Sequence, residues 1–182
     1  IALTQDESVG GIQLPHVVAS AALLWFDAAP VGTAAYALLT PGVANLVATF
    51  GTESQRERYL ELLLTGRYFG TMALTEPDAG SSLADLRTRA EPAGDEHPSG
   101  TYRISGTKMW ISGGEHELSE NIVHMVLARS PDGPPGTAGL SLFLVPKFLV
   151  NPDGSLGARN DLRAVSLEHK LGIHASPTCV MA

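Results

Sequence analysis

The sequence contains a single cysteine, no cluster of basic residues and no long apolar run, and each absence excludes a class of protein. Cys179 is the only cysteine, so no internal disulfide can form and a reducing compartment is favoured. The 12 basic residues are scattered and outnumbered by 19 acidic ones, which argues against a nucleic-acid partner. The longest apolar stretch, 17–26, is too short to cross a bilayer and lacks the charged start of a signal peptide. We therefore predict a soluble, cytoplasmic protein without membrane contact.

The usual catalytic signatures are missing too. No glycine fingerprint follows a strand, and there is no phosphate-loop motif. The consecutive residues Glu115, His116 and Glu117 do not converge on one ion, so we predict a solvated polar loop and no metal site. Cys179 is followed by apolar residues and is expected to be buried, not nucleophilic.

The composition is that of a folded domain, with 44% hydrophobic and 17% charged residues. Residues 1–66 read as helical. The run 17–26 is apolar all round, which predicts a helix buried on most sides. A second helical stretch, 33–50, is kinked or restarted at Thr40-Pro41. Thr52 and Gln55 have capping-box spacing and predict a third helix over 53–64.

From residue 68 the pattern changes to short strand-like runs separated by turn residues. The expected strands are 68–74, 87–91, 101–105, 108–112, 122–129, 140–145, 162–167 and one starting at residue 177. Turn-rich segments at 92–100, 130–138 and 150–160 are expected to be loops. The fold class predicted is an α+β fragment, a helical N-terminal segment (1–67) followed by an antiparallel β-barrel or sandwich-like domain (68–182). Because Ile1 is not a methionine and the sequence stops inside an expected strand, we expect a piece of a longer protein.

Two segments could carry chemistry. In 72–82 a strand ends in Thr75 and leads through a proline turn to Gly80, Ser81 and Ser82, whose backbone amides and hydroxyls could bind a phosphate or a carbonyl-rich ring. An ordinary Ser-capped turn is the alternative. In 106–114, Trp110 and Ser112 are two residues apart and so fall on one strand face. They could wall a planar cofactor, or simply pack in a core.

These segments carry a family resemblance. Residues 74–81 (LTEPDAGS) and 106–114 (GTKMWISGG) closely resemble, in order and separation, the two signature segments of acyl-CoA dehydrogenases. Residues 50–60 look like the last helix of that family's N-terminal domain, and 168–178 like a stretch late in its middle domain. The runs 114–124 and 171–174 look most like the branch that includes 3-methylmercaptopropionyl-CoA dehydrogenases.

The resemblance implies an FAD site, completed by a C-terminal helical domain that is absent here and by a neighbouring subunit. Carried over by position, Leu74 and Thr75 would bond the flavin pyrimidine ring. Trp110 would cover the ring, and Ser112 would bond near N5. The remaining implied cofactor contacts are Gly80 and Ser81 near the pyrophosphate, Ser81 also at the substrate cleft, and Met72 at a position that is often aromatic. Ser82 replaces a common Asp and His174 a common Arg, which puts those local contacts in doubt.

The implied activity is α,β-dehydrogenation of an acyl-CoA thioester, with hydride passed to flavin N5 and electrons to a separate flavoprotein acceptor. A homo-oligomer is implied as well. The catalytic base is expected to be a Glu of the absent domain, so no residue of this chain is predicted to be catalytic, and Glu76 is expected only to shape its turn. The isolated chain is expected to be inactive. Two alternatives stay open, a repurposed member of the fold such as a DNA-binding alkylation-response protein, and a purely structural fragment.

Overall fold

The computed structural model describes all 182 residues, and helices precede strands as the sequence predicts. The helical elements are η1 (Glu7–Val9), α1 (His16–Ala28), α2 (Val31–Ala34), α3 (Thr40–Phe50), α4 (Glu53–Gln55), the π-helical turn η2 (Arg56–Leu60) and α5 (Glu61–Leu64). The predicted capping box starts α4, since the Gln55 amide donates to Thr52 Oγ1 and the Gln55 side chain accepts from the Thr52 amide. The three pieces α4, η2 and α5 run on from one another over the predicted range.

Ten strands make three sheets. They are β1 (Tyr68–Ala73), β2 (Arg89–Pro92), β3 (Tyr102–Ser105), β4 (Lys108–Ser112), β5 (Asn121–Arg129), β6 (Leu140–Pro146), β7 (Phe148–Val150), β8 (Leu156–Arg159), β9 (Ala164–Leu167) and β10 (Thr178–Met181), with short 3-10 turns η3 (Leu83–Asp85) and η4 (Thr137–Gly139) between them. The main sheet has the order β1-β5-β2-β3, with β6 on the other edge of β5. A second sheet has the order β4-β10-β9, and β7 pairs with β8.

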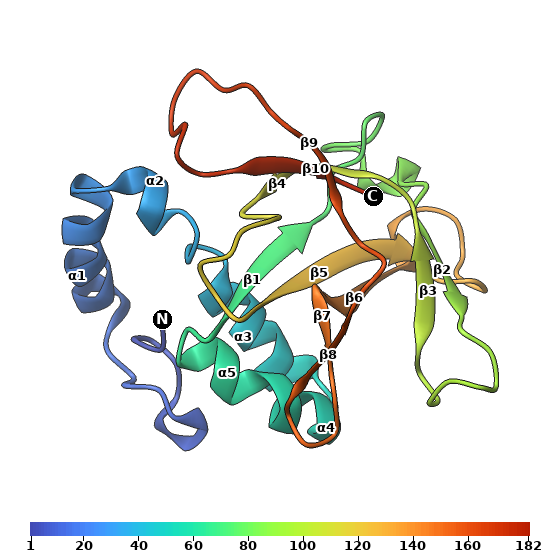
Figure 1. Cartoon of the computed structure of the whole chain (residues 1–182), viewed down its shortest axis with the longest axis horizontal. Helices are drawn as coiled ribbons and strands as arrows, with labels where there is room; N and C mark the ends of the chain where they lie inside the picture. The colour runs from blue at the N-terminus through green and yellow to red at the C-terminus, as the bar shows by residue number, and fades with distance from the viewer.

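The long central strand β5 separates two apolar clusters because its side chains alternate between its faces. On one face Val123 and Met125 pack with α3, η2 and α5. On the other face Val126 packs with Ile111 of β4 and Met181 of β10. Helices and the second sheet therefore cover opposite faces of β1 and β5 (Figure 1). Because the first cluster joins helices to strands, the division into 1–67 and 68–182 as separate domains stays a prediction.

The α+β, sandwich-like architecture is confirmed, but the strand pairing is not purely antiparallel. β1 and β2 both run parallel to β5, whereas β3 and β6 are antiparallel to their neighbours. The sheets do not close into a barrel. Short strands separated by turns indicate a β domain. Whether two paired strands run parallel or antiparallel depends on long-range pairing, which local sequence patterns do not encode.

The loop prediction for 150–160 was wrong in part, since β7 and β8 form a hairpin around it. The expected burial of the first helix is also wrong for this chain. Only Ala19 of α1 is buried, while Val17, Trp25 and Phe26 are exposed. Figure 1 shows α1 and α2 standing apart from the main sheet, in agreement with the exposure of these apolar side chains. None of the helices combines the length and the apolar character needed to cross a bilayer.

Candidate functional site

The two signature segments meet where β1 ends beside the start of β4. The Met109 amide donates to the Thr75 carbonyl at 2.9 Å. Lys108 Nζ donates to the Leu74 carbonyl, also at 2.9 Å. Residues more than thirty positions apart in the sequence are therefore held side by side by one main-chain bond and one bond from a lysine side chain.

A buried ion pair lies under this junction. Lys108 Nζ is 2.9 Å from Glu76 Oε1, and the side chains are only 5% and 7% exposed. The carboxylate also accepts from the Arg87 amide at 2.7 Å and the Thr88 amide at 2.9 Å. Burial alone would raise the pKa of Glu76, but hydrogen bonds from Thr88, Arg87 and Lys108 together lower it to about 2. Burial lowers the pKa of Lys108. Glu76 is therefore an ionised structural anchor, as its predicted turn-shaping role requires.

Trp110 sits at an irregularity of β4. Its φ of 63° is in the left-handed region, which a bulky residue rarely adopts. The pairing explains it, because Ile111 faces Cys179 and Lys108 faces Met181, so β4 has one more residue than β10 over this stretch. The bulge leaves the Trp110 side chain 53% exposed, while its neighbour Ile111 is buried. Trp110 and half-buried Ser112 flank Ile111 and face away from the core that Ile111 joins.

The segment after β1 folds back on itself. Glu76 and Ala79 exchange two main-chain hydrogen bonds, of 2.9 and 3.2 Å, across Pro77 and Asp78. The next residues, Gly80, Ser81 and Ser82, are exposed, and their amides donate to no acceptor of the chain. Arg87 pairs with Asp78 at 3.4 Å at the rim of this turn.

The structure thus brings most predicted site residues to one region, which we call the platform and define as Leu74, Thr75, Gly80, Ser81, Trp110 and Ser112. The hydroxyls of Thr75, Ser81 and Ser112 make no hydrogen bond within the chain. Met72 differs from these residues, because its side chain packs against the apolar cluster on the helix side of β1.

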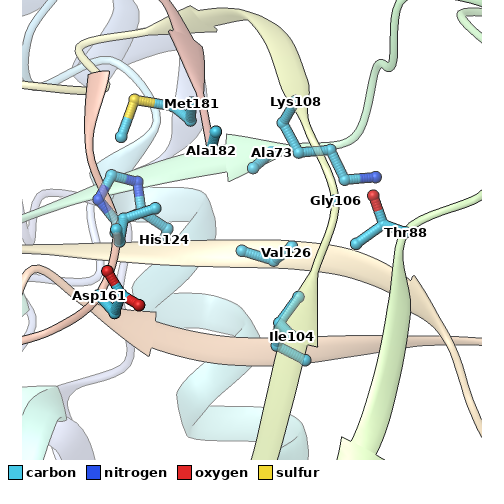
Figure 2. Close-up of a pocket in the computed structure, with 11 residues that line it drawn as sticks. Ala73, Thr88, Ile104, Gly106, Lys108, His124, Val126, Asp161, Met181 and Ala182 are labelled. Atoms are coloured by element: carbon cyan, nitrogen blue, oxygen red, sulfur yellow. The ribbon is translucent and has the colours of Figure 1, made fainter. Parts of the chain in front are cut away.

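The platform is a surface, and the neighbouring cavity lies behind it. A cavity of about 60 Å³ is lined by Ala73, Thr88, Ile104, Gly106, Lys108, His124, Val126, Asp161, Leu162, Met181 and Ala182. Figure 2 shows the Lys108 side chain extending across it toward Thr88, with His124 at the opposite end. None of Thr75, Trp110 and Ser112 lines it.

Three features were missed by sequence reasoning. The Glu76–Lys108 ion pair joins the two motifs. The sequence indicated it only by placing one acidic residue in the first motif and one basic residue in the second. His124 is fully buried, and its Nδ1 lies 2.7 Å from Thr71 Oγ1. The segment 115–117 is a loop, as predicted, but only Glu117 is well exposed, while Glu115 and His116 are half-buried. Buried Lys147 lies 2.5 Å from Glu115 Oε1 and 2.8 Å from Glu117 Oε1. Cys179 is buried as predicted.

Residues 71–182 match the family described as acyl-CoA dehydrogenase, middle domain. The chain belongs to the acyl-CoA dehydrogenase family. It is 51% identical over 179 residues to 3-methylmercaptopropionyl-CoA dehydrogenase of Ruegeria pomeroyi, a match covering 98% of this chain and 30% of that protein. It is 44% identical over 140 residues to butyryl-CoA dehydrogenase of Syntrophomonas wolfei, covering 77% of this chain and 22% of the relative.

The fold agrees with this assignment. The crystal structure of a glutaryl-CoA dehydrogenase from Mycobacterium smegmatis in complex with FADH2 superposes with a TM-score of 0.72 at 26% identity, covering 100% of this chain and 40% of that one. The predicted family and branch likeness are thereby confirmed. The chain spans less than a third of the length of these two relatives.

Proposed function

We propose that this chain forms part of the cofactor and substrate platform of an FAD-dependent acyl-CoA dehydrogenase. The observation that carries the proposal is the junction of the two signature segments, which gathers unpaired donors beside an exposed aromatic ring. The family match and the 51% identity to a named acyl-CoA dehydrogenase support it.

The chemistry of the platform fits FAD. The isoalloxazine ring presents carbonyl oxygens and a flat face, and the pyrophosphate presents anionic oxygens. The Thr75 and Ser112 hydroxyls and the Gly80 and Ser81 amides have no acceptor within the chain. The exposed Trp110 indole offers a large apolar face. Free hydrogen-bond donors next to an aromatic surface suit a cofactor of this shape better than a purely packed core.

Each residue then has a distinct task. Leu74, through its main chain, and Thr75, through its hydroxyl, hold the pyrimidine edge of the flavin. Trp110 covers the ring and keeps water away from it, and Ser112 donates near N5. Gly80 and Ser81 hold the pyrophosphate, and Ser81 also faces the CoA end of the substrate. When bound, FAD supplies the hydride acceptor for dehydrogenation of the acyl-CoA thioester. Donors fixed at the edge where negative charge develops favour the transition state.

The rest of the proposal concerns the whole protein. The base is a carboxylate outside this chain, because Glu76 is held in a buried ion pair and Asp78, the other acidic residue of the turn, pairs with Arg87 at its rim. The substrate is an acyl-CoA thioester, the electrons pass to an acceptor flavoprotein, and a homo-oligomer completes the site. Met72 as a cofactor contact and a cytoplasmic location stay predictions. The relatives that match are dehydrogenases, so the DNA-binding alternative is not favoured.

The experiment is a single-turnover measurement on the full-length protein that contains this chain. Loaded with FAD and mixed with acyl-CoA thioesters, it is expected to lose flavin absorbance as the flavin is reduced. Ser112→Ala should slow this reduction by about ten- to a hundredfold with little change in substrate affinity, because its bond matters most in the transition state. A folded, FAD-loaded protein that no acyl-CoA reduces would contradict the proposal. Equal rates of flavin reduction in the parent and in Ser112→Ala would show that Ser112 only packs and does not assist the reaction.

A further inference from the structure

The Glu76–Lys108 ion pair lies at the junction of the signature segments without itself belonging to the platform surface. Both side chains are almost fully buried. Every group that they bond lies in the motifs or in the two residues Arg87 and Thr88 that follow the turn. The pair thus connects the strand end, the turn and β4 at one point.

Three bonds lock the two segments in register. Lys108 Nζ bonds the Leu74 carbonyl and the Glu76 carboxylate, and the Met109 amide bonds the Thr75 carbonyl. Three consecutive residues of one segment are therefore tied to two consecutive residues of the other. Trp110 is the next residue along β4.

Trp110 needs this support because of its backbone conformation. A left-handed conformation is unfavourable for a bulky side chain and persists only where the surroundings hold it. The Met109 bond fixes the chain just before Trp110, and the pairing of Ile111 with Cys179 fixes it just after. Without the Lys108 side chain, the hydrogen bond between Met109 and Thr75 would lose the adjacent bonds that hold the two segments together.

A proton-transfer role for Glu76 does not fit the geometry. One carboxylate oxygen accepts from Lys108 and the Thr88 amide, and the other accepts from the Arg87 amide. Both oxygens are engaged and shielded from solvent. These three hydrogen bonds suit a carboxylate that holds the surrounding segments in place.

We propose that Glu76 and Lys108 are positioning residues that set Trp110 and Thr75 relative to one another, so that the flavin platform is already formed before the cofactor binds. The part of this inference that concerns flavin binding rests on the proposed function. Its structural part, the immobility of Trp110 in the cofactor-free protein, can be measured separately.

The test uses the full-length protein labelled with 5-fluorotryptophan and free of FAD. The Trp110 fluorine signal is identified as the one missing from Trp110→Phe. Lys108→Met is expected to broaden or split this signal and move it toward that of free 5-fluorotryptophan. Lys108→Arg keeps the charge and the donors, and is expected to retain the parental signal.

Lys147→Met is the matched control, because Lys147 is equally buried and paired with acidic residues outside the platform. It should lower the unfolding midpoint comparably and leave the Trp110 signal unchanged. After FAD loading, Lys108→Met should slow flavin reduction by acyl-CoA by about a hundredfold, as misplacement of reacting groups does. Lys147→Met should not.

A folded Lys108→Met protein with the parental Trp110 signal would overturn the inference. If that variant does not fold, the near-isosteric Glu76→Gln decides the question, and an unchanged Trp110 signal there has the same meaning. If the parent takes up no FAD, the proposed function falls, while the fluorine spectra still decide whether the ion pair positions Trp110.

Discussion

His124 is an ionisable side chain that the fold keeps away from water. It lies on β5, hydrogen-bonded through Nδ1 to Thr71 on the neighbouring strand β1, while its Nε2 has no partner. Burial is the main cause that lowers the pKa of His124 from 6.5 to about 4. The folded protein therefore holds this imidazole neutral at a pH where the unfolded chain protonates it.

This histidine should make the protein acid-sensitive in a defined window. Between pH 6.5 and 4 the unfolded state binds a proton that the folded state does not, so stability falls as the pH falls, and above pH 6.5 His124 adds no pH dependence. The stability advantage of the parent over His124→Gln should shrink by about 2 to 3 kcal/mol between pH 7 and 4.5. Denaturant unfolding at both pH values measures it. Exposed His97→Gln is the control and should follow the parent. Identical pH slopes for parent and His124→Gln would contradict the assignment.

Residue-level chemistry was only partly visible in the sequence. The motifs contain Thr75, Trp110 and Ser112, and the strand that carries the last two was predicted with its observed bounds. The bulge at Trp110 could not be predicted, since it arises from a mismatch with β10, some seventy residues away. Likewise, Glu76 and Lys108 are charged residues that the sequence alone would place on the surface, and only the fold shows that they are buried together.

At the scale of elements, the contact between α3 and β1 depends on a residue without a side chain. A Cβ placed on Gly70 would lie 2.6 Å from the Val43 Cβ, and Val43 is completely buried. The Gly70 amide donates to Thr40 Oγ1 at 3.0 Å. Thr40, the first residue of α3, therefore joins the helix to the strand through its hydroxyl.

Gly70→Ala should therefore destabilise the protein by about 1 to 3 kcal/mol, the usual cost of overpacking a core. Combining it with Val43→Ala should cost less than the sum of the two single changes, because the added methyl fills part of the space that Val43 leaves. Gly42→Ala is the control on the same helix. Its new Cβ meets no atom within 4 Å, so it should stabilise the helix by up to about 1 kcal/mol. Free energies from chemical denaturation measure all four variants. A Gly70→Ala protein as stable as the parent would refute the close approach.

The order of helices and strands could be predicted from local sequence signals. Which strands pair with one another, and which surfaces the helices cover, could not. The capping box at Thr52 predicted the helical run 53–64, and the turn residues between strands predicted eight strands to within a few residues. The hairpin β7–β8 was missed because its short strands flank the turn residues 151–154 and β8 itself contains Gly157, so the whole segment has the composition of a loop. The apolar face of α1 correctly indicated a helix, but a pattern of hydrophobicity cannot say which surface will cover it.

At the scale of the whole molecule, the chain is a helix-backed sheet whose opposite side carries a second sheet and the platform. The strands β1 and β5 pass through the middle, and the two signature segments emerge where β1 meets β4 (Figure 1). The sandwich therefore presents the platform side chains at the junction of β1 and β4. The chain spans only part of its relatives' length.

A titration of the full-length, cofactor-free protein with FAD tests most directly whether this platform holds the cofactor. The parent is expected to bind one FAD per subunit, and Trp110→Ala should bind about ten- to a hundredfold more weakly because it loses a large aromatic contact. Trp25→Ala, which changes an exposed tryptophan of α1, should bind as the parent does. A folded full-length protein that takes up no FAD, or a Trp110→Ala variant with parental affinity, would contradict the account.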